Sequence, residues 1–177
     1  MHPFLQHYST VTVPTLKKQF SYSSDYLVPK IEKVVINVGL GDLKENQGSM
    51  DQVAALIAKI AGQKPVYTKA TKAVAGFKIR IGMTVGLKVT LRGDRMHDFL
   101  QKLIVISLPR TRDFRGLSAG AITPSGSLHV GIKDSMIFPE VANENTSHPM
   151  QVTIVAKTSS KEETRALYES LGFVFQS

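Results

Sequence analysis

The chain has 177 residues, 42% of them hydrophobic, which is enough to bury the core of one domain. It has no cysteine, and this excludes disulfides, thiolate zinc sites and a cysteine nucleophile. Its net charge of +8 equals the net charge of residues 59–95, which contain nine Lys or Arg and one acid. Because the charge is confined to one segment, we expect a polyanionic partner, with nucleic acid as the first candidate and an anionic membrane as the second.

The N-terminal part of the chain predicts a helical element over about residues 1–29, with a short helix at 14–20, and then a strand at 30–38. The strand is rich in β-branched residues and alternates with period two. Val34, Ile36 and Val38 point one way, and Lys33, Val35 and Asn37 point the other way.

Two further elements are expected before residue 70. Ser49 and Gln52 have the spacing of a capping box, and the apolar residues behind them recur with the period of an amphipathic helix. Gly62 is the expected end of this helix. Residues 65–69 can form a short strand.

The clearest strand is predicted at residues 85–92. Its alternation leaves Lys88, Thr90 and Arg92 in a row on one side, about 6–7 Å apart. Sheets that leave one face open bind RNA with such residues, because cations meet phosphates and small polar groups meet 2′-hydroxyls and base edges. A half-exposed strand of any protein also has a polar side, so this strand alone leaves both interpretations open.

The C-terminal half predicts a helix capped by Asp94 and ended by Pro109, and then a loop-rich stretch at 111–130. A strand follows at 151–157. Ser160 and Glu163 form a second capping box, which opens a helix that Gly172 stops, and residues 173–175 can pair as a last strand. The order of elements favours an α+β fold, a mostly antiparallel sheet with helices on one face and an exposed RNA-binding face.

Two basic segments have both a functional and a structural interpretation. Residues 76–86 alternate apolar and basic side chains between glycines, as in an arm that projects toward RNA or in an ordinary hairpin with one buried face. Residues 109–116 hold three arginines around Phe114, namely Arg110, Arg112 and Arg115. Arginine side chains bind phosphates and stack on bases, so these three can contact RNA. Alternatively, Asp113 pairs with one of them and the segment only supports the preceding helix; the spacing does not decide between the two interpretations.

Catalytic and metal motifs are weak. Gly39 and Gly41 lack the third glycine of a dinucleotide fingerprint, and the five histidines are scattered without metal-ligand spacing. We therefore expect no enzyme, no cofactor and no metal. A membrane partner would need a basic amphipathic helix, whereas the charge here falls mainly on strands and loops.

Six short segments together resemble one known family. They are residues 60–65 (IAGQKP), 68–70 (TKA), 75–80 (AGFKIR), 88–93 (KVTLRG), 112–116 (RDFRG) and 138–140 (FPE). Their order and spacing resemble those of ribosomal protein five of the large subunit, bacterial type, from about Tyr8 to the C-terminus. The fold expected from the resemblance and the pattern is a ferredoxin-like variant, one ribosomal domain with a projecting loop at about 70–86.

The resemblance implies a structural protein of the large subunit, located in the cytoplasmic ribosome or in that of an organelle. Its implied partners are 5S rRNA, 23S rRNA in the central protuberance, peptidyl-site tRNA, neighbouring 5S-binding ribosomal proteins and a small-subunit head protein. The family's 5S-contacting polar residues fall on Asn37, Gln63 and Thr90. With the nearby cations, the expected 5S rRNA site comprises Lys33, Asn37, Gln63, Lys64, Lys88, Thr90 and Arg92.

The tRNA-facing arm of the family falls on Gly76, Phe77, Lys78, Ile79, Arg80, Gly82 and Met83, and the three arginines are further expected RNA contacts. The chain departs from the family at Thr71, Ile81 and Thr84, and in segments 118–130 and 141–149, whose contacts are not carried over. The alternative function is a non-ribosomal module that binds structured RNA as a regulator or chaperone.

Overall fold

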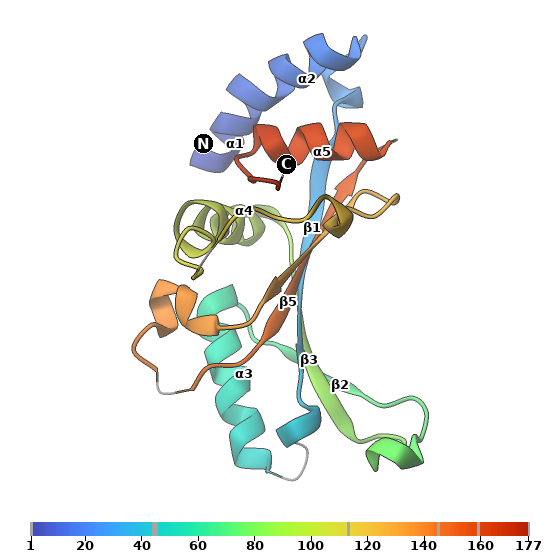
Figure 1. Ribbon diagram of the computed structural model, residues 1–177, viewed down its shortest axis with the longest axis vertical. Helices are drawn as coiled ribbons and strands as arrows, with labels where there is room; N and C mark the ends of the chain where they lie inside the picture. The colour runs from blue at the N-terminus through green and yellow to red at the C-terminus, as the bar shows by residue number, and fades with distance from the viewer. Residues whose placement is uncertain (1, 44–45, 113, 145, 159, 177) are drawn as a thin grey trace.

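The computed structural model describes residues 2–43, 46–112, 114–144, 146–158 and 160–176. One antiparallel sheet contains β1 (Lys30–Gly39), β2 (Val66–Lys69), β3 (Thr84–Leu91), β4 (Ser127–Ile132) and β5 (Met150–Lys157). Its strand order is β2-β3-β1-β5-β4. Figure 1 shows the helices on one side of this sheet, namely α1 (Pro3–His7), α2 (Val13–Phe20), α3 (Gln47–Ala61), α4 (Gly93–Lys102) and α5 (Lys161–Ser170). The predicted α+β class is confirmed.

The sheet has the strand order of a ferredoxin-like fold with one added strand. Without β4, the chain runs β1-α3-β2-β3-α4-β5 and the strands lie in the order β2-β3-β1-β5. β4 pairs with β5 at the edge. The prediction of a loop-rich stretch up to residue 130 is therefore wrong for its last residues. The alternation from Ser127 to Ile132 is regular, but Pro124 and Gly126 directly before it are typical of a loop.

The register of β1 with its two neighbours decides which side chains are buried. Val34 is paired with Leu91 and Ile154, and Ile36 with Val89 and Val152. All of these side chains are at most 2% exposed, because they face the helices. They belong to one core cluster that runs from Leu16 to Phe173 and includes residues of α2, α3, α4 and α5. Burial on this scale is the main stabilising term of the fold.

The helix ends confirm some of the predicted caps and correct others. Asn46, not Ser49, is the N-cap of α3, and its side chain accepts a hydrogen bond from the Ser49 amide at 3.1 Å. Asp94 lies in the first turn of α4 and does not cap it. Ser160 does cap α5, since its hydroxyl accepts from the Glu163 amide at 3.2 Å. The glycines at 62 and 172 end their helices with φ values of +64° and +100°.

Two π-helical turns lie in regions where the sequence predicts helix, one in the N-terminal helical element and one in the helix that Pro109 ends. Residues Tyr8–Thr12 join α1 to α2, and residues Leu103–Ser107 continue α4. A proline stands two residues after the end of each turn, Pro14 or Pro109. A proline ring has no N–H and clashes with the carbonyl four residues earlier, and the wider turn relieves that clash. The N-terminal helical element therefore runs from residue 3 to residue 20.

The C-terminal residues form a single bridge where a last strand was expected. Phe175 pairs with Leu117 in an isolated parallel bridge. The amide of Leu117 donates to the Val174 carbonyl at 2.8 Å, and the Gln176 amide donates to the Leu117 carbonyl at 2.8 Å. The prediction of a strand at 173–175 is therefore wrong, although this segment does fix the stretch after α4 to the C-terminal end.

The turn before β4 depends on Gly126. Its φ is +85°, and a Cβ built there would lie 2.9 Å from the Ala156 carbonyl oxygen and 2.5 Å from the Thr158 Oγ1. That hydroxyl is itself held by Thr164 at 2.7 Å. We predict that Gly126→Ala lowers the free energy of unfolding by more than about 2 kcal/mol, because strain and a backbone clash combine.

Chemical denaturation measures this effect, and Gly131→Ala is the matched control. A Cβ at Gly131 meets no atom within 4 Å, and its φ is not positive. The control should leave the unfolding free energy unchanged or slightly raised, because alanine restricts the unfolded chain. Equal losses for both variants would show that the turn does not have this geometry.

Histidine contacts hold α1 against α4. The His97 ring stacks on Phe4 with their centroids 5.6 Å apart, and His2 Nε2 lies 2.6 Å from Asp98 Oδ1. His97 Nδ1 is buried and has no hydrogen-bond partner. Burial, with the neighbouring His2, lowers the pKa of His97, against an opposing effect of Asp94 and Asp98. The folded state therefore disfavours protonated His97.

We predict that stability falls as the pH drops through the ordinary histidine pKa of about 6.5. The sign follows because the unfolded chain binds the proton more readily than the folded one. Unfolding free energies at pH 7.5 and pH 5.5 measure the effect, with His97→Phe as the comparison, since a phenyl ring keeps the stack without titrating. An unchanged pH dependence in that variant would remove His97 as its source.

Candidate nucleic-acid interface

The helix-free side of the sheet, here called the open face, collects polar side chains in rows. Asn37 of β1 lies directly between Lys88 of β3 and Gln151 of β5, and Gly131 of β4 continues the row. The next row contains Thr90, Val35, Thr153 and His129. The predicted residues Lys33, Asn37, Lys88 and Thr90 therefore share one surface, although they come from two distant parts of the sequence.

The open face is cationic because few acids accompany its lysines. In the five strands, all of whose residues are described, Glu32 is the only acid. It pairs with Arg92, whose Nη1 lies 3.2 Å from Glu32 Oε1. Among the described residues, Lys33, Lys64 and Lys88 form no ion pair. Arg92 is thus partly neutralised, and the lysines remain available to an anionic ligand.

Gln63 reaches the sheet from the loop after α3. Its side-chain amide donates to the Thr90 carbonyl at 3.3 Å, and its Oε1 accepts from Arg95 Nη1 at 3.4 Å. Gln63 is half-buried, whereas Lys64 next to it is exposed. The backbone and side-chain contacts fix Gln63 beside Thr90, so the structure brings this predicted pair together.

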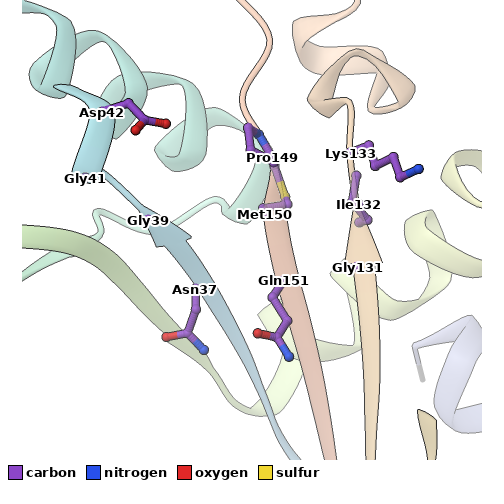
Figure 2. A pocket seen from close by; sticks show the side chains of 10 residues that line it. All are labelled: Asn37, Gly39, Gly41, Asp42, Gly131, Ile132, Lys133, Pro149, Met150 and Gln151. Carbon is purple, nitrogen blue, oxygen red and sulfur yellow. The ribbon is translucent and has the colours of Figure 1, made fainter. Parts of the chain in front are cut away.

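A shallow hollow of about 590 Å³ lies at one end of the open face. Figure 2 shows the amides of Asn37 and Gln151 side by side on β1 and β5, with Asp42 and Lys133 further along the rim. Its floor is open because Gly39 and Gly131 have no side chains, and a Cβ at either position would meet nothing within 4 Å. The hollow can receive a group that hydrogen-bonds to two amides.

The sequence interpretation missed the part of the open face that β4 and β5 contribute. His129 Nδ1 lies 3.0 Å from Thr153 Oγ1 and 3.3 Å from Gln151 Nε2, so these three side chains form one polar group. The alternation of residues 151–157 indicated which side of β5 is polar. The expected ferredoxin-like order implies that β5 pairs with β1, but no local pattern gave the register, and it is this register that places Gln151 beside Asn37.

The predicted arm is an ordered loop over residues 70–83, between β2 and β3. Its base is closed by hydrogen bonds from the Ala70 amide to the Met83 carbonyl at 2.8 Å and from the Gly82 amide to the Ala70 carbonyl at 2.9 Å. Val74 and Ile79 form a bridge closer to the tip. The Arg80 amide also lies 3.1 Å from Met83 Sδ.

The tip of the arm has no buried face. Phe77 is 70% exposed and Ile81 is 71% exposed, and Lys78 and Arg80 are exposed too. The ordinary-hairpin alternative requires apolar residues packed on the core, and the structure contradicts it for Phe77 and Ile81. Lys78 adopts a left-handed φ of +51° after the 3₁₀ turn Ala75–Phe77. Figure 1 shows the loop reaching away from the helices at the end of the sheet.

The three arginines of residues 110–115 are exposed and lie apart from the open face. They follow the π-helical turn that ends α4, on the helix side of the sheet (Figure 1). The Thr111 amide donates to the Leu108 carbonyl at 3.0 Å, and Phe114 packs against the core. Asp113 lies outside the described residues, so its predicted internal pairing stays a prediction.

Metal sites and membrane spans have no support in the described part of the chain. No three His, Asp or Glu side chains gather there as a metal ion would require. No helix in the described ranges combines the length and the apolar character that crossing a bilayer needs.

The fold and this surface define a class of α+β proteins with helices on one side of an antiparallel sheet and an uncovered, cation-rich face on the other. Within that class, the family model described as ribosomal protein L5 matches residues 25–80, and the model described as the ribosomal L5P family C-terminus matches residues 84–175. The chain therefore belongs to the ribosomal protein L5 family, as its sequence motifs predict.

Curated relatives match it over nearly their whole length. The large ribosomal subunit protein uL5 of Oceanobacillus iheyensis is 44% identical over 178 residues, which are 99% of each chain. The protein of the same name from Synechococcus elongatus is 49% identical and covers 96% of each chain. That of Symbiobacterium thermophilum is 46% identical over 95% of this chain and 94% of its own.

Proposed function

We propose that the protein is a structural constituent of the large ribosomal subunit, in the cytoplasmic ribosome or in that of an organelle, and that its open face binds 5S rRNA. Family membership and the names of the relatives support the ribosomal role. The observation that carries the RNA-binding role is the open face itself, where lysines that form no ion pair with any described residue share one helix-free surface with uncharged hydrogen-bonding groups.

The two kinds of side chain on the open face would act on different parts of an RNA. Lys33 and Lys88 on the open face, and Lys64 in the loop after α3, form no ion pair with a described residue. They would contact phosphates, which supplies affinity without sequence preference. Asn37 and Thr90 lie between these charges and would contact 2′-hydroxyls or base edges. An A-form minor groove is wide and shallow, so a broad sheet face fits it better than a narrow cleft would.

The arm and the arginines would supply contacts away from 5S rRNA. In this proposal the exposed tip from Gly76 to Met83 contacts tRNA in the peptidyl site, with Lys78 and Arg80 against its backbone. The hydrogen bonds at the base of the arm support this, because they reduce the ordering cost of binding. The arginines at 110, 112 and 115, on the other side of the molecule, would contact a different RNA surface, for which 23S rRNA is our candidate. The chain would also contact neighbouring 5S-binding proteins and a small-subunit head protein.

The test is the affinity for 5S rRNA across a salt series, measured for the wild-type chain and two variants. With on the order of five phosphate contacts, the dissociation constant should rise roughly a thousandfold between low and moderate salt. Lys88→Ala should reduce the slope of log affinity against log salt concentration by about the contribution of one phosphate contact. Asn37→Ala should weaken binding by about 1–3 kcal/mol at every salt concentration, because it removes a hydrogen bond and no charge.

Asn143→Ala is the matched control for Asn37→Ala, since Asn143 is exposed after the 3₁₀ turn Pro139–Val141, which packs against α3. It should bind as the wild type does. Affinity that is insensitive to salt, or unchanged in both open-face variants with the fold intact, would contradict the proposal. Sedimentation decides between this function and a free RNA-binding module, because a ribosomal constituent co-migrates with the large subunit.

A further inference from the structure

Tyr26 is an aromatic side chain that the fold leaves in solvent. It is 98% exposed, and Leu27 beside it is 60% exposed. The other four tyrosines are buried or half-buried. Single exposed apolar side chains are common on protein surfaces, but here an exposed ring and an exposed leucine are adjacent and stand next to two lysines.

The turn that carries Tyr26 has hydrogen bonds of its own and one ion pair to α2. The Ser24 hydroxyl accepts from the Tyr26 amide at 3.4 Å, and the Ser24 carbonyl accepts from the Leu27 amide at 3.2 Å. Lys17 of α2 lies 2.6 Å from Asp25 of the same turn. The chain then enters the core at Val28, which is 3% exposed. The ring thus stands on a turn with defined backbone contacts, and these reduce the backbone ordering that a stacking ligand would require.

Two lysines face each other next to this ring. Lys30 begins β1 and Lys157 ends β5, and the two are direct partners in the sheet. Directly opposed residues have Cβ atoms about 4.5–5.5 Å apart, and like charges at this distance repel. Neither lysine forms an ion pair with a described residue. An anion bound between them would remove the repulsion.

The ring and the two lysines line one hollow of about 270 Å³, with Glu163 on its wall. The side chain of Lys157 follows Thr153 and Val155 along the same side of β5, so the hollow continues the open face beyond its first rows. A phosphate would be drawn to the lysines and away from the Glu163 carboxylate, which leaves the exposed ring for the base.

We propose that Tyr26, Lys30 and Lys157 form a subsite for one unpaired nucleotide of the bound RNA. The base stacks on the Tyr26 ring, and its phosphate lies between the two ammonium groups. The nucleotide is unpaired because a base inside a duplex has no free face to stack on a side chain. This inference rests on the proposed function, and it extends the RNA path along the sheet toward the start of β1.

The test uses the full-length chain and 5S rRNA. Tyr26→Ala should raise the dissociation constant about 5- to 150-fold, the range that loss of one base–aromatic stack produces. Tyr26→Phe should bind as the wild type does, because the ring is kept. Tyr26 is almost fully exposed, so neither variant should change stability, and thermal unfolding checks this.

The phosphate half of the subsite is tested by its charge. Lys157→Ala should weaken binding and flatten the logarithmic salt slope by about 0.7, the value for one phosphate of a single strand. Lys18→Ala is the matched control, since it removes the same charge from an exposed position on α2 that lines neither the hollow nor the open face. It should leave both quantities unchanged.

The Asn37→Ala variant separates failure of this inference from failure of the proposed function. Weaker binding for Asn37→Ala with unchanged binding for Tyr26→Ala would overturn the subsite and leave the function standing. Unchanged binding for both would overturn both. If Tyr26→Ala binds RNA normally but no longer binds a purified neighbouring ribosomal protein, the ring is a protein contact and the subsite is wrong.

Discussion

The antiparallel pairing of β1 with β3 on one side and with β5 on the other determines which side chains reach the open face. Side chains alternate along a strand, so a one-residue slip of β1 against its neighbours would turn Asn37 toward the helices and expose Ile36. A one-residue slip of β3 against β1 would do the same to Lys88 and Val89. The burial of the apolar side against α3, α4 and α5 prevents either slip. The stability of the core and the composition of the proposed RNA surface therefore depend on the same register.

The same pairing explains how a charge concentrated in one stretch of sequence becomes two separate surfaces. Residues 59–95 contain the end of α3, β2, the arm and β3. The sheet places Lys88 beside Asn37 on the open face, whereas the arm carries Lys78 and Arg80 away from it. Strands outside the stretch then extend the open face, because β5 adds Gln151 and Lys157. The surface that we propose for RNA is thus wider than the basic stretch.

Much of the fold follows from local patterns in the sequence. The strands at 30–39, 84–91 and 150–157 are predicted within one residue at each end because their apolar and polar residues alternate. The helix at 161–170 is predicted because Ser160 and Glu163 before it have the spacing of a capping box. The strand at 127–132 was missed, since it is short and begins directly after a proline and a glycine that are typical of loops. The Asn46 cap was missed because Ser49 offered an equally good local signal.

The candidate site is only partly predictable, because strand partners and exposure are decided by tertiary packing. Asn37, Lys88 and Thr90 were identifiable from alternation, but the position of Gln151 beside Asn37 depends on a pairing between residues 114 positions apart. Tyr26 stands in a sequence of ordinary loop composition, and only the packed structure shows that its ring is left in solvent. The two π-helical turns likewise follow from how each helix accommodates the proline after it.

The most direct test of the account is a lysine-acetylation footprint of the protein with and without 5S rRNA, read by mass spectrometry. The account predicts that RNA protects Lys33, Lys88 and Lys157, whose strand positions place them on the open face. It predicts that Lys18 on α2 and Lys161 at the start of α5 remain reactive. Protection of the helix-side lysines, with the open-face lysines still reactive, would contradict the central claim that the uncovered side of the sheet binds the RNA.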